Sequence, residues 1–222
     1  MHVTALLPMK GHSERVPGKN LRKMGDKPLF FHVATTLQQC ELVDTIVINT
    51  DSESIADQAE KKFSKVRINW RPEDICGDFV SMNTIIDYDL QHNSATHFLQ
   101  THSTNPLLSV KTLTGAVESY FAKLGEYDSL FSVTRLQTRL YWESGAPINH
   151  SPEELLRTQD LPPVFEENSN MYIFNKESFA ASGKNRIGVK PQMFVMDPLE
   201  AMDIDEECDF IMAERLLAMQ NL

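Results

Sequence analysis

Short apolar runs alternate with segments of helical period up to about residue 134, and this alternation limits the fold more than any other feature of the chain. The runs have the length of buried strands, and the segments between them place apolar residues on one helical face. Strands and helices that alternate in this way form a sheet with mostly parallel neighbours and a helical layer on each face. The expected strands are 3–7, 44–49, 66–70, 95–100 and 128–134, and the expected helices are 28–37, 52–59, 81–91 and 109–121.

The alternation stops between residues 135 and 168. That stretch contains four prolines and no run of helical period, so we expect an inserted hairpin or arm. The alternation resumes with a strand at 171–175, a helix at 176–181, a strand at 193–196 and a helix from about 206 to 219. A length of 222 residues fits one domain, and the sequence therefore predicts a single α/β domain over residues 1–222, with an arm at about 135–168.

The charge of the chain is divided unevenly. Lys and Arg number 21 and Asp and Glu 31, which gives a net charge of −10. Residues 1–27 hold six basic and two acidic side chains (+4), so the remainder carries 15 − 29 = −14. An acidic surface argues against binding polymeric nucleic acid or an anionic membrane, but it leaves room for a small phosphate site.

Cysteine usage and hydropathy indicate the compartment. Cys40, Cys76 and Cys208 form no CxxC pair, so neither a disulfide framework nor a zinc cage is expected. The first residues lack the apolar run of a secretion signal, and no run approaches the length of a membrane span. We therefore expect a cytoplasmic protein.

The basic charge lies in a loop that directly follows the first expected strand. Ligands of α/β sheets bind beyond the carboxyl ends of strands, where main-chain N–H groups and basic side chains hold phosphate. The loop is not a Walker A motif, because six residues separate Gly11 from Gly18 and Asn20 follows Lys19. We interpret it as a phosphate-binding loop; the alternative is a solvated surface loop.

A cluster of carboxylates lies near the other end of the chain, at 203–209. In an extended segment Asp203 and Asp205 face the same side, and two carboxylates suit Mg²⁺ that is also bound by substrate phosphates. Capping of the last helix by one of these residues, with Glu206 and Glu207 in its first turn, is the alternative, and the two roles are compatible.

Four segments, spaced over nearly the whole chain, follow one family pattern. PMKGHSERVPGKN at 8–20 is similar to P-A-R-x-x-S-K-x-x-P-x-K-N, and RPEDICGD at 71–78 is similar to RPxxLAxD. LQTHSTNPL at 99–107 is similar to LLQPTSPLR, and DIDEECD at 203–209 is similar to DIDxxxD. In this order the segments resemble the acylneuraminate cytidylyltransferase family, which makes CMP-activated sialic and related 3-deoxy-2-ulosonic acids.

The resemblance implies a Rossmann-like three-layer sandwich with a parallel-dominated mixed sheet. It implies an enzyme that condenses CTP with a sugar acid, releases pyrophosphate, requires Mg²⁺ and forms a homodimer. In the family, the segment that matches 135–168 is a dimerisation arm that reaches the partner's site.

The resemblance also assigns roles to individual residues. It implies a triphosphate and leaving pyrophosphate held by Lys10, Ser13, Arg15 and Lys19, with Lys10, Arg15 and Lys19 as the catalytic cations. The nucleotide site as a whole would comprise Lys10, Gly11, Ser13, Lys19, Asn20, Arg71, Val80 and Met82. The sugar acid would contact Gln100 and Tyr172, with Arg157 at its carboxylate, and Mg²⁺ would be held by Asp203 and Asp205. No residue is assigned as a general base.

The chain departs from the family pattern at several places. Lys10 replaces an Arg and loses its bidentate fork, Glu14 replaces a Lys, and Met82 replaces a Ser. An insertion at 101–104 and Leu108 in place of an Arg fall where the family contacts the sugar, so the acid is open among sialic, legionaminic, pseudaminic and octulosonic acids. Two other functions remain: a GT-A glycosyltransferase that uses Asp203-Ile204-Asp205 as a DxD motif, and a catalytically silent nucleotide-binding relative.

Overall fold

The computed structural model describes residues 1–13, 15–77 and 79–220, so that Glu14 and Asp78 of the family pattern lie outside the described residues. The strands of the main sheet are β1 (Val3–Leu6), β4 (Val43–Thr50), β5 (Val66–Trp70), β6 (His97–Thr101), β7 (Ser129–Leu136), β8 (Val164–Asn175) and β9 (Pro191–Met196). The α-helices are α1 (Leu29–Gln39), α2 (Glu53–Lys62), α3 (Met82–Gln91), α4 (Val110–Ala122), α5 (Lys176–Ala181) and α6 (Glu207–Gln220). Smaller elements are the antiparallel pair β2 (Lys23–Met24) and β3 (Lys27–Pro28) and the 3-10 turns η1 (Glu73–Ile75) and η2 (Thr158–Asp160).

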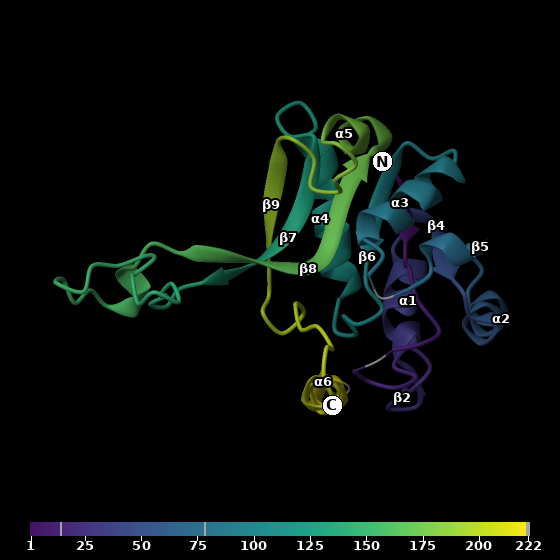
Figure 1. The fold of residues 1–222 in the computed structure, drawn as a ribbon, viewed down its shortest axis with the longest axis horizontal. Helices are drawn as coiled ribbons and strands as arrows, with labels where there is room; N and C mark the ends of the chain where they lie inside the picture. The colour runs from purple at the N-terminus through teal and green to yellow at the C-terminus, as the bar shows by residue number, and fades with distance from the viewer. Residues whose placement is uncertain (14, 78, 221–222) are drawn as a thin grey trace.

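Within the described residues, a seven-stranded mixed sheet has the order β5-β4-β1-β6-β8-β7-β9 (Figure 1). Strand β8 runs antiparallel to both of its neighbours, while the other neighbouring pairs are parallel. The prediction of a parallel-dominated mixed sheet is therefore confirmed. Because β1, β4 and β6 are parallel, their carboxyl ends meet at one edge, where a ligand site is expected.

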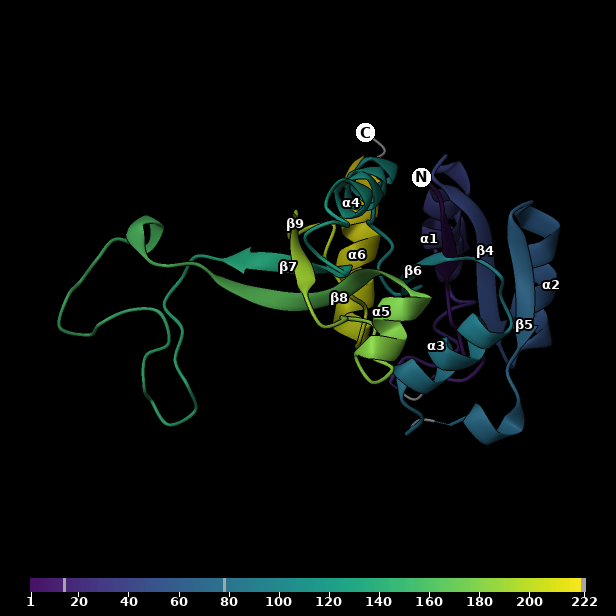
Figure 2. The same cartoon turned by 90° about the horizontal axis from the view of Figure 1, so that it is seen from above.

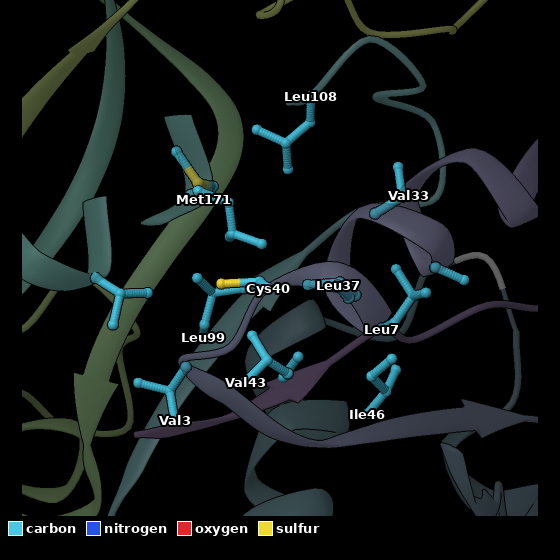
Figure 3. Packing of buried hydrophobic residues seen from close by; sticks show 14 of the residues in the cluster. Val3, Leu7, Val33, Leu37, Cys40, Val43, Ile46, Leu99, Leu108 and Met171 are labelled. Carbon is cyan, nitrogen blue, oxygen red and sulfur yellow. The ribbon is translucent and has the colours of Figure 1, made fainter. Parts of the chain in front are cut away.

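Helices cover both faces of the sheet, which confirms the three-layer prediction (Figure 2). Helices α1, α2 and α4 pack against one buried apolar cluster, and α3 and α5 pack against another on the opposite face. Strand β1 contributes to both clusters, because its side chains alternate between the faces: Ala5 belongs to the first and Leu6 to the second. Figure 3 shows the first cluster, in which Val33 and Leu37 of α1 lie over Leu7 and Ile46.

Serine and asparagine side chains begin several of the helices. Ser52 accepts a hydrogen bond from the main-chain N–H of Ile55, and Ser109 accepts one from Thr112. Asn175 and Ser178 form a reciprocal capping box at the start of α5. None of the helices in the described part of the chain combines the length and the apolar character that crossing a bilayer requires.

Strands β7 and β8 continue past the sheet as a two-stranded ribbon, and residues 137–163 at its end project away from the body (Figures 1 and 2). The sequence predicted a strand only from 171, whereas β8 begins at Val164. Its first half is polar because the ribbon is solvated, so the apolar run that marks a buried strand is absent there. A register shift lies between Phe131 and Val133, where the opposite strand contains Ser169 at φ 54°.

Replacement of a core leucine tests the packing of α1. Leu37 has no exposed surface in the cluster of Figure 3, so Leu37→Ala is expected to lower the free energy of unfolding by about 2–5 kcal/mol. Gln39→Ala, at an exposed position of the same helix, should change it by no more than about 0.5 kcal/mol. Urea denaturation followed by circular dichroism measures both; equal effects of the two substitutions would contradict the burial of this face.

Candidate functional site

A cavity of about 410 Å³, here called the loop cavity, lies where the basic loop follows β1. Eight of the predicted nucleotide and catalytic residues line it: Lys10, Ser13, Arg15, Lys19, Asn20, Arg71, Val80 and Met82. The structure therefore brings together side chains that are up to 72 positions apart in the sequence, counting from Lys10 to Met82. The prediction that this loop forms part of a site, rather than a solvated surface, agrees with this arrangement.

The basic loop is anchored to the sheet edge through its main chain and through Asn20. The N–H of Met9 donates to the carbonyl of Asn49 at 2.9 Å. The Asn20 amide donates from Nδ2 to the carbonyl of Lys10 (3.0 Å), and its Oδ1 accepts from the Ser103 hydroxyl (2.7 Å). Asn20 thus joins the loop to the segment after β6, in addition to lining the cavity.

Gly11 differs from its predicted neighbours, because it does not line the loop cavity. Its N–H, expected to face phosphate, donates to Asp51 Oδ1 at 2.7 Å. A Cβ atom at this position would lie 2.9 Å from the Cβ of Ser52, which is closer than real side chains approach. In this structure the glycine permits the close approach of the loop to the end of β4.

The acidic segment near the C-terminus binds the basic loop. Lys19 Nζ donates to the carbonyl of Ile204 (2.6 Å), and Arg15 Nη2 pairs with Asp205 Oδ1 (2.6 Å). Outside the cavity, the two η nitrogens of Arg22 donate to the two carboxylate oxygens of Glu207, and the guanidinium lies 4.0 Å from the ring centroid of Phe210. The carboxylates of the acidic segment therefore adjoin the loop cavity.

Asp209 satisfies the main chain at the start of α6. Its Oδ2 accepts hydrogen bonds from the N–H groups of Asp205 (3.1 Å) and Glu206 (2.7 Å). The sequence left helix capping by Asp203 or Asp205 open; the observed contacts come from Asp209 instead. Asp205 Oδ1 pairs with Arg15.

Asp203 has the environment of a cation ligand. Its Oδ1 is buried and finds no hydrogen-bond partner among the described residues. Burial raises the pKa of Asp203, and the neighbouring Asp205 charge adds to that shift. Burial likewise lowers the pKa of Lys19, against the opposing attraction of the two carboxylates. An orphaned carboxylate oxygen beside a second carboxylate fits a hard divalent cation.

These two carboxylates do not by themselves make a complete metal cage. Within residues 1–13, 15–77 and 79–220, no group of three or more His, Cys, Asp or Glu side chains is placed to hold a metal ion. A cation at this place would take its remaining ligands from substrate oxygens and water, the arrangement typical of Mg²⁺ in phosphate chemistry.

A second cavity of about 530 Å³ lies at the root of the arm and is called the arm-root cavity. Asp203 and Asp205 line it together with Glu166, Glu167, Asn168 and Ser169 of β8, and Asp205 also pairs with Arg15, which lines the loop cavity. The predicted sugar contact Tyr172 is buried and lines neither cavity, but its hydroxyl donates to Glu167 and lies 3.2 Å from Ser169 Oγ, and both of these residues line the arm-root cavity. Burial raises the pKa of Tyr172 to about 12, so the hydroxyl keeps its proton.

Gln100, the other predicted sugar contact, is buried and lines neither cavity. Its Oε1 accepts from Arg186 Nη1 (2.6 Å), and its Nε2 faces the carbonyl of Thr101 (2.9 Å) and His102 Nε2 (3.0 Å). Since the Arg186 bond fixes the amide orientation, Nε2 donates to His102 and the imidazole proton lies on Nδ1. The structure thus places His102, rather than Gln100, at the loop cavity.

The sequence assigned no role to His102 or Arg186. Burial, with the charges of Arg186 and Lys19, lowers the pKa of His102 to about 3, so its ring is neutral at neutral pH. The Arg186 guanidinium lies 3.7 Å from the ring centroid of Tyr172. His102 lies in the inserted segment beside Gln100, which was a usable signal, whereas the turn that carries Arg186 has no pattern that distinguishes it.

Arg157, predicted at the sugar carboxylate, lies in the arm and lines neither cavity of its own chain. Its guanidinium pairs with Asp160 of the same turn, Nε to Oδ2 at 2.6 Å. The structure of one chain does not bring this residue to the site.

Comparisons with known proteins agree with this geometry. The family model described as Cytidylyltransferase matches residues 4–221. The chain is 31% identical over 221 residues to N-acylneuraminate cytidylyltransferase A of Danio rerio, covering 96% of this chain but only 50% of the relative. It is 28% identical over 236 residues to the CMP-N,N'-diacetyllegionaminic acid synthase of Legionella pneumophila, covering 100% of this chain and 98% of the relative.

Solved structures show the same fold. A CMP:2-keto-3-deoxy-manno-octonic acid synthetase complexed with CTP aligns over 99% of this chain and 100% of its own, with a TM-score of 0.72 at 14% identity. The 4-diphosphocytidyl-2C-methyl-D-erythritol synthase of Anaerococcus prevotii aligns over 98% of this chain and 96% of its own, with a TM-score of 0.70 at 13% identity. The match over residues 4–221, carried on this fold, shows that the chain belongs to the cytidylyltransferase family.

Proposed function

We propose that the protein transfers CMP from CTP to the anomeric hydroxyl of a 3-deoxy-2-ulosonic acid and releases pyrophosphate. The observation that carries this proposal is the placement of Lys10, Arg15 and Lys19 in one cavity beside the carboxylates of Asp203 and Asp205. The names of the relatives, which act on sialic and legionaminic acids, supply the substrate class. A glycosyltransferase has no support from the family match.

In the proposed reaction the sugar hydroxyl forms a bond to the α-phosphorus of CTP while the bond to the bridging oxygen of pyrophosphate breaks. Such a transfer depends on alignment and charge neutralisation more than on covalent help from the protein. Lys10, Arg15 and Lys19 would neutralise the triphosphate and the leaving pyrophosphate, and the Ser13 hydroxyl would donate to it. Asn20, Arg71 and the segment from Val80 to Met82 would contact the cytosine and ribose.

Asp203 and Asp205 would hold Mg²⁺, since a buried Asp203 oxygen has no hydrogen-bond partner among the described residues. When bound, the ion neutralises phosphate charge and lowers the pKa of the attacking hydroxyl. Arg15 contacts Asp205 in this structure. Arg15 would therefore hold the phosphates close to the carboxylates of Asp203 and Asp205.

The arm-root cavity is the proposed site of the sugar acid, because Asp203 and Asp205 line it and Asp205 pairs with Arg15, which lines the loop cavity. Tyr172 would contribute there by holding Glu167 and Ser169, which its hydroxyl contacts.

We place the reaction in the cytoplasm. The support is that Cys40, Cys76 and Cys208 are all free, as expected in a reducing compartment.

The reaction is tested with purified protein, CTP, Mg²⁺ and a panel of sialic, legionaminic, pseudaminic and octulosonic acids. We expect pyrophosphate and a CMP-sugar in equal amounts with at least one acid, measured by a coupled phosphate assay and mass spectrometry. Reactions without the acid are the control. CTP binding with no pyrophosphate from any acid would instead favour the catalytically silent relative.

The metal site is tested by Asp203→Asn and Asp205→Asn. Each should lower turnover by about two orders of magnitude or more, because a bound cation supplies several kcal/mol of charge stabilisation. Asp57→Asn, an exposed carboxylate on α2, is the matched control and should leave turnover unchanged. Binding of Mn²⁺ in the presence of CTP, followed by electron paramagnetic resonance, provides a second readout. Normal turnover and normal Mn²⁺ binding in both variants would contradict the proposal that Asp203 and Asp205 hold the cation.

We also propose that two chains form a homodimer through the arm at residues 137–163. The support is the set of apolar side chains that the arm exposes, among them Trp142 at 63% and Leu155 at 88% relative exposure. Large apolar side chains in such a projection are expected to be covered by another protein surface. In a dimer the arm would also carry Arg157 to a second site that its own chain does not provide.

The arm prediction is tested by the double substitution Trp142→Ser with Leu155→Ser. Sedimentation equilibrium of the unaltered protein should give twice the chain mass of 25.3 kDa. The double variant should weaken self-association about tenfold or more, since buried aromatic anchors dominate the energy of interfaces. Trp70→Ser, which removes a similarly exposed tryptophan from β5, is the control. A monomeric parent protein would contradict the proposal.

A further inference from the structure

Asp89 of α3 is a buried carboxylate that the proposed reaction does not use. Its side chain has no exposed surface, and its neighbours along α3, Ile86 and Leu90, belong to the apolar cluster on this face of the sheet. Its Oδ1 accepts hydrogen bonds from Asn49 Nδ2 (2.7 Å) and Asn69 Nδ2 (2.9 Å). Its Oδ2 is buried without a partner among the described residues, and burial raises the pKa of the group. Burying a carboxylate with one oxygen unpaired costs free energy of folding.

The two amides that bind Asp89 lead to the loop cavity. Asn49 on β4 and Asn69 on β5 are direct partners in the parallel register. Arg71, which lines the cavity, follows β5 immediately. Its Nε donates to Asn49 Oδ1 (2.7 Å), and its Nη2 donates to the main-chain carbonyl of Asn49 (3.0 Å).

The chemistry of the amide links these contacts. An asparagine side chain presents a donor at one end and an acceptor at the other, so fixing one end fixes the other. Asp89 Oδ1 accepts only if the Asn49 NH₂ group faces it, and Asn49 Oδ1 must then face Arg71. With the amide reversed, Asn49 would present a donor to a guanidinium that can only donate.

We infer that Asp89 is a positioning residue for Arg71, acting through the side chain of Asn49 to hold the guanidinium in the orientation that binds the nucleotide. The inference rests on the nucleotide role of Arg71 in the proposed function. The amino-terminal end of α3 lines the same cavity through Met82 and Ile85, so one helix supplies both a wall of the site and the support behind it.

The test compares two substitutions at one position. Asp89→Leu removes the acceptor and should weaken CTP affinity about tenfold, the effect of losing one hydrogen bond to a charged group. It should raise KM for CTP and leave both kcat and the KM for the sugar acid unchanged. Asp89→Asn keeps an acceptor oxygen and should stay within about threefold of the parent. Asp87→Asn, on the same helix but bound to Lys184, is the control and should match the parent.

A double-mutant cycle with Arg71→Ala separates positioning from a general effect on folding. CTP affinity is measured by calorimetry, and thermal unfolding is recorded for each variant. On the Arg71→Ala background, Asp89→Leu should cause no further loss of CTP affinity. An equal loss of CTP affinity from Asp89→Leu with and without Arg71, or normal CTP affinity in Asp89→Leu, would overturn this inference but not the proposed function. Normal CTP affinity in Arg71→Ala itself would overturn both the inference and the nucleotide role of Arg71. If Asp89→Leu fails to fold, Asn49→Leu tests the same link.

Discussion

The pairing of the basic loop with the acidic segment before α6 is the interaction on which the site depends. It joins residues near position 20 to residues near position 205, at the edge of the sheet where β1 ends. Exposed ion pairs such as Arg15 with Asp205 contribute little free energy of folding individually. Lys19 differs, because it is half-buried and its contact is to a main-chain carbonyl. The loop is therefore held by this contact together with the hydrogen bonds of Asn20 and the main-chain hydrogen bonds of Met9 and Gly11.

This pairing also gives the net charge of the chain a more specific meaning. The value of −10 sums a basic segment and an acidic remainder, and the structure places part of each in contact. In the free protein the basic side chains of the loop pair with carboxylates of the acidic segment. On the proposed function, the basic side chains would bind phosphate and the carboxylates would bind a divalent cation. On that function, cations that line a cavity beside carboxylates would suit a phosphate and a divalent cation bound together, rather than either alone.

The sequence predicted the layers and most elements well, because their signals are local. The run from Val3 was sufficient for β1, and Lys176–Ala181 was predicted at its observed bounds. The start of β8 at Val164 was missed, because a solvated ribbon needs no apolar pattern. At the site, the loop residues were found because a motif marks them. The environment of Gln100 was not predicted, because its partner Arg186 is 86 positions away in the sequence and is brought to it only by the fold.

The contacts that sequence reasoning missed share a physical property: each of them holds another protein side chain in place. Gln100 is oriented by Arg186, Asn49 by Asp89, and Tyr172 by Glu167 and Ser169. An amide or hydroxyl that is buried must be hydrogen-bonded, so each such group specifies the orientation of the next. A motif identifies the side chains that touch a substrate, whereas the precision with which they are held comes from this buried layer. Departures from a family motif, such as Lys10 or the inserted segment with His102, therefore have to be judged against the supporting contacts and not only against the pattern itself.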